Sequence, residues 1–196
     1  MIPLFMGAAG FILYFLYDIN SFRWNRRVVR TFFAAGSLLI GLATSLDFYK
    51  AWKAGAFQGG IDGVLLLSAA VSFAALIYCL FFALPFEKTY VEQENGRTVY
   101  DGGVYALCRH PGVLCFAAMY LFSGLAALPE DLLLHGSIWS ILNVVYAWFQ
   151  DRVTFPRTFC NYESYQKRIP FLIPTKDSVY LALDSWSSLR NEEDDR

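Results

Sequence analysis

The chain has 196 residues, of which 56% are hydrophobic, 18% aromatic and only 17% charged, with a formal net charge of −1 at neutral pH. A soluble domain of this length normally carries more charge, so the composition favours an integral membrane protein. Nucleic acid is excluded as a partner, because the sequence has no surplus of cations to neutralise phosphates.

Five apolar stretches predict an all-α fold, a single membrane domain of about five transmembrane helices with a C-terminal tail. Arginines follow the first stretch and no basic leader precedes it, which is the reverse of a secretory signal, so we interpret it as an uncleaved span. Residues 47–62 predict a polar loop, and residues 150–196 form the tail. The predicted spans are about residues 2–17, 28–46, 63–86, 111–128 and 132–149.

The distribution of cations predicts the orientation of the spans. Fourteen lysines and arginines lie in the loop after the first span, in the loop before Pro111 or in the tail, whereas only Lys50 and Lys53 lie on the other side. By the positive-inside rule we expect the N-terminus outside, and the segment before Pro111 and the tail in the cytosol.

The segment 103–112 places an arginine and a histidine directly before an apolar span. Proline fits the first turn of a helix, where its missing N–H would have no partner, so Pro111 predicts a helix start. Arg109 and His110 would then lie at the positive end of that helix, beside free backbone N–H groups. This arrangement predicts a site for an anionic group such as a cofactor carboxylate.

The fifth predicted span carries polar and aromatic side chains at intervals of three and four residues, so they share one helix face. In lipid such a face should contact protein or a cavity, and we expect it to line a substrate pocket. These residues are Trp139, Asn143, Tyr146 and Gln150. His135, near the opposite membrane face, is interpreted as an interfacial residue.

The chain offers little for a metal site. The cysteines show no C-x-x-C spacing, and we interpret them as reduced packing residues. With two histidines in the chain, a zinc or iron site would need an unusual ligand set, so we expect no metal. The four cysteines are Cys79, Cys108, Cys115 and Cys160.

The tail interleaves cations with aromatic residues, which predicts a helical surface segment lying against the membrane and interrupted near Pro156. A last amphipathic helix is expected from Asp177 as its cap. Its apolar face would pack on the same chain, on lipid or on a second subunit of a homodimer. The predicted face consists of Val179, Ala182, Leu183, Trp186 and Leu189.

These motifs together resemble the isoprenylcysteine carboxyl methyltransferase and phospholipid methyltransferase group of integral membrane enzymes. The resemblance rests on an ordered set of motifs in residues 99–174: Tyr105, the triplet 109–111, a helical hairpin, Phe159-x-x-Tyr162-x-x-Tyr165 and Pro170-x-Leu172-x-Pro174. It implies S-adenosylmethionine as the cofactor, bound at the cytosolic helix ends beneath the tail.

The resemblance also implies roles for individual residues. Arg109 would face the substrate, and Asp151 would correspond to one of two acids at the exit of the last span. The acceptor would be a lipophilic small molecule reaching the site through the membrane. An acceptor carboxylate needs only a cation such as Arg109, whereas an amine needs a base, Asp151 or neutral His110. The cofactor would contact Tyr105, His110, Pro111, Gly112, Tyr162 and Tyr165.

The sequence departs from the family pattern at three positions. Val113 replaces an aromatic residue, Arg152 replaces the second acid, and Cys160 replaces a glycine. Two alternatives therefore stay open. One is a non-catalytic relative that serves as a membrane scaffold or partner-binding protein, and the other is a membrane reductase, since sterol reductases share a similar C-terminal arrangement.

Overall fold

The structure is a computed structural model that describes residues 1–83 and 97–194. These residues form an all-helical membrane bundle, as the sequence predicts. They divide into two compact units, unit 1 (residues 1–73 and 115–154) and unit 2 (residues 74–114 and 155–196), and each unit is described by itself. The prediction of a single domain stays a prediction.

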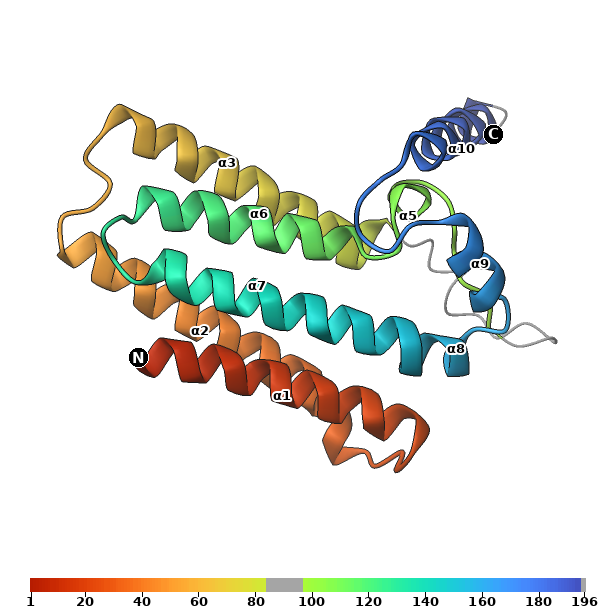
Figure 1. The fold of residues 1–196 in the computed structure, drawn as a ribbon, viewed down its shortest axis with the longest axis horizontal. Coiled ribbons are helices and arrows are strands. Elements are labelled where there is room, and N and C mark those ends of the chain that lie inside the picture. Colours follow the sequence, from red (N-terminus) through yellow and green to blue (C-terminus); the bar gives the residue numbers. More distant parts are fainter. Residues whose placement is uncertain (84–96, 195–196) are drawn as a thin grey trace. The chain divides into compact units, whose positions relative to one another are not determined.

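Unit 1 is built on the packing of α1 (Ile2–Phe22) against α2 (Phe32–Lys53), with α7 (Leu132–Phe149) packed against both (Figure 1). A 3₁₀ turn, η1 (Val28–Thr31), leads into α2. A π-helix, η3 (Gln150–Thr154), directly continues α7. The unit also holds most of α3 (Gly60–Ile77) and of α6 (Pro111–Ala126).

Glycines allow α1 and α2 to approach closely. A Cβ atom added to Gly10 would lie 2.8 Å from the carbonyl oxygen of Gly36, and one added to Gly36 would lie 2.7 Å from the carbonyl oxygen of Gly10. Small residues at such crossings are typical of membrane helices, because van der Waals packing drives their association.

The helices show that this is a multi-pass membrane protein. Four are long and apolar enough to span a bilayer, namely Ile2–Phe22, Val28–Lys53, Gly60–Phe82 and Leu132–Thr158. The helix Pro111–Ala126 is apolar but shorter, with 16 residues. Residues 84–86, at the end of the third predicted span, lie outside the described residues.

Two predicted boundaries are wrong. The first span continues to Phe22, and the polar loop expected from residue 47 begins only after Lys53. Asp47 stays helical because its side chain is buried and has a partner within the bundle. Lys50 and Lys53 occupy the last turn of α2, where cations interact favourably with the helix dipole.

Unit 2 contains helices from the tail and from the segment before Pro111 (Figure 1). They are α5 (Val104–Leu107), α8 (Phe155–Thr158), α9 (Tyr162–Arg168) and α10 (Lys176–Asp194), together with the π-helix η2 (Tyr78–Phe82). Tyr162, Tyr165 and Ile169 form a buried cluster against which Val99 and Phe159 pack.

The start and the buried face of α10 both differ from prediction. Thr175 rather than Asp177 caps the helix, because the backbone N–H of Thr175 donates to Ser178 Oγ at 2.9 Å and that of Ser178 donates to Thr175 Oγ1 at 3.3 Å. The helix packs on α5, with Ser178 and Ala182 fully buried. Three residues of the predicted apolar face are exposed instead, namely Val179, Leu183 and Trp186.

Candidate functional site

The arginine–histidine motif lies in a sharply turning segment of unit 2. Gly103, with a φ of +58°, precedes α5, and Cys108 is extended between α5 and α6. Helix α6 begins at Pro111, as predicted, and the N–H of Val113 donates to the carbonyl oxygen of His110 at 3.1 Å. Arg109 and His110 therefore directly precede the N-terminus of α6.

His110 is buried among aromatic rings of the tail. Its imidazole lies nearly parallel to the ring of Phe155, with centroids 5.7 Å apart and an interplanar angle of 11°. The ring of Phe171 approaches its edge at 5.1 Å. The structure thus brings the motif and the tail together within one unit.

Arg109 forms hydrogen bonds with the C-terminal end of α9 and the residues that follow it. Its Nη1 donates to the carbonyl oxygen of Gln166 at 3.1 Å and to that of Ile169 at 2.5 Å, and its backbone N–H donates to the carbonyl oxygen of Pro170 at 2.9 Å. The guanidinium also lies over the ring of Phe171, 5.7 Å from its centroid. These contacts give Arg109 a structural role; the predicted contact with the substrate stays a prediction.

The tyrosines of the motif and of the tail are connected by hydrogen bonds. The hydroxyl of Tyr165 donates to the carbonyl oxygen of Tyr105, and that of Tyr105 donates to the carbonyl oxygen of Cys79, both at 2.7 Å. Burial raises the pKa of the Tyr165 phenol. Pro111 is buried and Gly112 is half-buried. All six residues predicted to contact the cofactor belong to unit 2, as does Arg109.

The residues predicted to line the substrate pocket lie in unit 1. Asp151 lies in the same unit and is buried. Tyr146 is buried, with its ring stacked on Tyr14 at 5.4 Å, and its hydroxyl accepts a hydrogen bond from Gln150 Nε2 at 3.0 Å. The π-helix starts at Gln150, and π-helical turns occur frequently at functional sites. Asn143 is half-buried.

Trp139 is a core residue of the bundle. It is 0% exposed, and its Nε1 donates to the carbonyl oxygen of Leu4 at 3.2 Å. Its indole lies directly against Gly7, where a Cβ atom would collide with the ring. The ring of Tyr120 meets it edge-on at 5.3 Å. Within the described residues its surface is therefore covered by protein.

Sequence reasoning missed Asp18. This residue of α1 is 4% exposed, and the side chains of Gln150, Tyr146 and Thr154 lie near its carboxylate. The signal was available, since an acid in an apolar span is a candidate functional residue. The predicted span ended at Tyr17, so Asp18 was assigned to the following loop.

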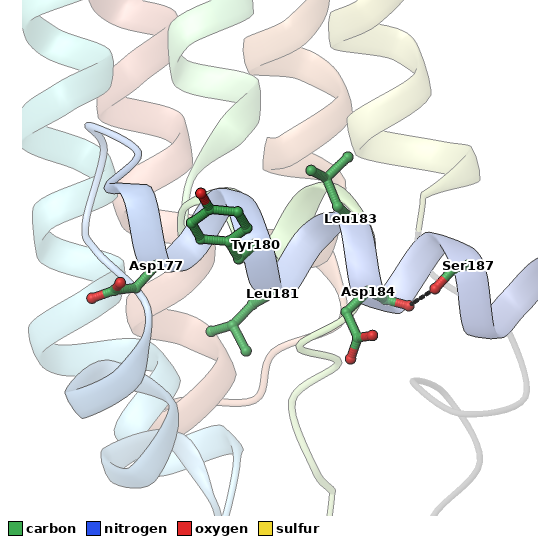
Figure 2. A pocket seen from close by; sticks show the side chains of 6 residues that line it. All are labelled: Asp177, Tyr180, Leu181, Leu183, Asp184 and Ser187. Carbon is green, nitrogen blue, oxygen red and sulfur yellow. Dashed lines mark hydrogen bonds between the residues drawn. The ribbon is translucent and has the colours of Figure 1, made fainter.

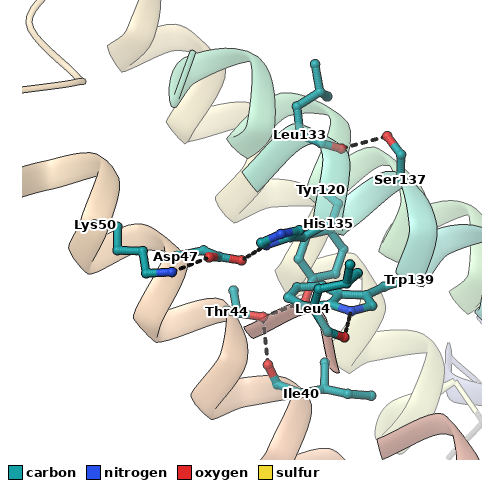
Figure 3. Close-up of polar contacts among 10 residues, drawn as sticks. All are labelled: Leu4, Ile40, Thr44, Asp47, Lys50, Tyr120, Leu133, His135, Ser137 and Trp139. Carbon is teal, nitrogen blue, oxygen red and sulfur yellow. Dashed lines mark hydrogen bonds and ion pairs between the residues drawn. The ribbon is translucent and has the colours of Figure 1, made fainter. Parts of the chain in front are cut away.

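The buried pair of Asp47 and His135 was also missed (Figure 3). His135 Nδ1 lies 2.7 Å from Asp47 Oδ2, and both side chains are essentially fully buried. Lys50 Nζ is 4.0 Å from the other carboxylate oxygen. The interpretation of His135 as interfacial is therefore wrong. The imidazole turns inward because a buried carboxylate stabilises it there.

Two other features bear on possible sites. A depression of about 760 Å³ runs along α10, and none of the predicted site residues lines it (Figure 2). Its lining consists of Asp177, Tyr180, Leu181, Leu183, Asp184 and Ser187. Across residues 1–83 and 97–187, no three histidine, cysteine or acidic side chains are grouped so as to hold a metal ion.

Comparisons with known proteins leave the family open. No family model matches the sequence, and no curated protein or solved structure is significantly similar to it.

Proposed function

We propose that the motif in unit 2 binds S-adenosylmethionine and that the protein transfers its methyl group to a lipophilic acceptor at the boundary between membrane and cytosol. One observation carries the proposal: segments about 50 residues apart in the sequence, the motif 103–112 and the tail 155–171, meet around His110 and Arg109. Several of the motifs behind the resemblance thereby come together in one compact unit.

The chemistry of these residues fits the cofactor. Aromatic faces attract a sulfonium and stack on an adenine ring, and unit 2 gathers Tyr162, Tyr165 and Phe155 close to His110. The N-terminus of α6 favours a carboxylate. The residues that would hold the cofactor are Tyr105, His110, Pro111, Gly112, Tyr162 and Tyr165. When bound, the cofactor supplies an activated methyl group, and the protein orients it and excludes water.

Arg109 acts in this proposal chiefly as a positioning residue. Its bonds to the carbonyl oxygens of Gln166 and Ile169 hold the tail beside the motif. The acceptor in this proposal is a lipophilic amine or carboxylate, and an amine would need a base to remove its proton. The proposed orientation follows the arginines and lysines, with the N-terminus outside and the site and tail cytosolic.

A second candidate is a non-catalytic scaffold of the same architecture. The observation that favours it is the chemistry at two positions. Val113 is buried and apolar where the family has an aromatic residue, and Arg152 is an exposed cation where the family has an acid. A membrane reductase is the third candidate, and it requires a nicotinamide cofactor in place of S-adenosylmethionine.

Equilibrium dialysis of the purified protein in detergent against labelled S-adenosylmethionine separates these candidates. We expect saturable binding that weakens at least tenfold in His110→Ala and is unchanged in Lys167→Ala, a control on the exposed side of α9. A melting curve checks that each variant is folded. Absence of binding at millimolar cofactor would favour the scaffold, and saturable binding of a nicotinamide dinucleotide would favour the reductase.

A further inference from the structure

The connection between α1 and α2 is a compact, strongly basic surface. We define the arginine loop as residues 23–30, which contain four arginines and no acidic residue. All four arginine side chains are exposed, and so is Trp24. Arg23, Arg26 and Arg27 lie between two candidate membrane spans, Ile2–Phe22 and Val28–Lys53, and Arg30 lies in the first turn of the second, so these cations lie at a membrane boundary.

A buried asparagine holds the loop in one conformation. Asn20 is 1% exposed, its Nδ2 donates to the carbonyl oxygen of Arg26 at 3.1 Å, and the N–H of Arg26 donates back to Asn20 Oδ1 at 2.8 Å. The N–H of Asn25 donates to the carbonyl oxygen of Asn20 at 2.7 Å, and Asn25 adopts a positive φ of 49°. The arginines therefore project from a fixed backbone.

Within residues 1–83 and 97–187, the structure shows no acidic side chain that neutralises the arginine loop. In the part of the chain that the structure describes, no carboxylate pairs with Arg23, Arg26 or Arg27, and Arg30 donates to a neutral group, Asn25 Oδ1, at 2.6 Å. Arg168 of α9 differs, because it pairs with Asp101 at 2.6 Å. A partner of the arginine loop must therefore bring negative charge.

We propose that the arginine loop is a binding surface for the phosphate-bearing headgroups of anionic phospholipids. Arginine binds phosphate through paired N–H donors, and anionic leaflets attract juxtamembrane cations. The effect of arginines on membrane orientation depends on how many cations lie near the span and not on their conformation. Orientation alone therefore does not explain why Asn20 holds the loop in one conformation. Exposed Trp24 is suited to the headgroup level of the bilayer. This proposal is independent of methyl transfer.

Native mass spectrometry of the full-length protein in detergent, titrated with dioleoyl phosphatidylglycerol or dioleoyl phosphatidylcholine, tests the proposal. Each juxtamembrane arginine strengthens binding to anionic lipid about fivefold. We therefore expect the Arg23→Gln, Arg26→Gln, Arg27→Gln triple variant to bind phosphatidylglycerol at least tenfold more weakly than wild type. The control removes two other exposed cations, by Lys167→Gln and Lys176→Gln, and should change affinity less than twofold. Equal losses in the triple variant and in this control would overturn the proposal.

Two further arms test the role of conformation and the identity of the ligand. Asn20→Ala keeps every charge and should still lower phosphatidylglycerol affinity at least threefold; if it melts early, Asn25→Ala, which removes the contact with Arg30, replaces it. Wild-type affinity in a folded variant of either kind would refute a preorganised site. Glycerol phosphate should not displace the lipid, and displacement at equal concentration would indicate a site for a soluble anion instead.

Discussion

Asp47 on α2 and His135 on α7 form a hydrogen bond of 2.7 Å that is closed off from solvent. Removing one partner of a buried hydrogen bond leaves the polar group of the other unsatisfied, which typically costs about 1–3 kcal/mol. We therefore expect His135→Leu and Asp47→Leu each to lower the free energy of unfolding in detergent by roughly that amount.

The double variant, Asp47→Leu with His135→Leu, should recover most of this loss, because two apolar side chains replace the pair without leaving an unsatisfied buried polar group. A double-mutant cycle measured by denaturant unfolding gives the coupling free energy. Additive single effects would show that the two side chains do not stabilise each other.

The contact between Gly10 and Gly36 predicts opposite effects for two substitutions on α2. Gly36→Ala places a methyl group against the α1 backbone and should destabilise the protein by about 1–3 kcal/mol. Gly41→Ala meets nothing within 4 Å and should stabilise the helix by about 0.5–1 kcal/mol. Melting temperatures in one detergent compare the two, and a loss of stability in Gly41→Ala would contradict the described packing.

Arg109 and Arg168 both connect the tail with the segment before Pro111, but in different environments. Arg109→Ala removes two bonds to carbonyl oxygens, each worth about 1.5–3 kcal/mol, and should speed amide exchange in α9 at least tenfold. Arg168→Ala removes an exposed pair with Asp101 worth at most about 1 kcal/mol and should change exchange little. Equal exchange rates in the two variants would mean that Arg109 does not hold the tail.

Burial of the Tyr165 phenol predicts that the free energy of unfolding decreases at alkaline pH. Burial raises the pKa of its phenol above the ordinary value of 10.0, so above that pH the unfolded chain releases a proton that the folded chain keeps. The stabilisation is fully present below pH 10 and is lost as the pH rises further.

Tyr165→Phe should therefore melt at a lower temperature at pH 7, because the bond to the carbonyl oxygen of Tyr105 is lost, and show a smaller further decrease at pH 11 than wild type. Tyr180→Phe, at a tyrosine that is 71% exposed, is the control. An unchanged difference between pH 7 and pH 11 in Tyr165→Phe would contradict burial of this phenol.

Much of the fold could be predicted from apolar runs and helix signals. The bounds of α7 agree with the predicted span, and α6 begins at Pro111, because hydropathy and proline act locally. The predicted helix boundaries were wrong where a residue far away in the sequence keeps a polar side chain inside the helix. Asp47 stays in a helix because of His135, 88 residues further along the chain, and no local pattern reports that pairing.

The candidate site was predictable only in part for the same reason. Short-range motifs identified His110, Tyr162 and Tyr165, which the structure gathers in unit 2. Asp18 was missed because the predicted first span ends at Tyr17, whereas α1 continues to Phe22. Trp139 has the same spacing as Asn143, Tyr146 and Gln150 yet packs into the core. Spacing on one helix defines a face but does not say what that face contacts.

Photochemical crosslinking with S-adenosylmethionine labelled in its methyl group tests the central proposal most directly. We predict saturable labelling of peptides within residues 103–112 or 155–171, abolished by excess S-adenosylhomocysteine and strongly reduced in His110→Ala. Absence of saturable labelling, or labelling confined to unit 1 and insensitive to His110→Ala, would contradict a cofactor site at the arginine–histidine motif.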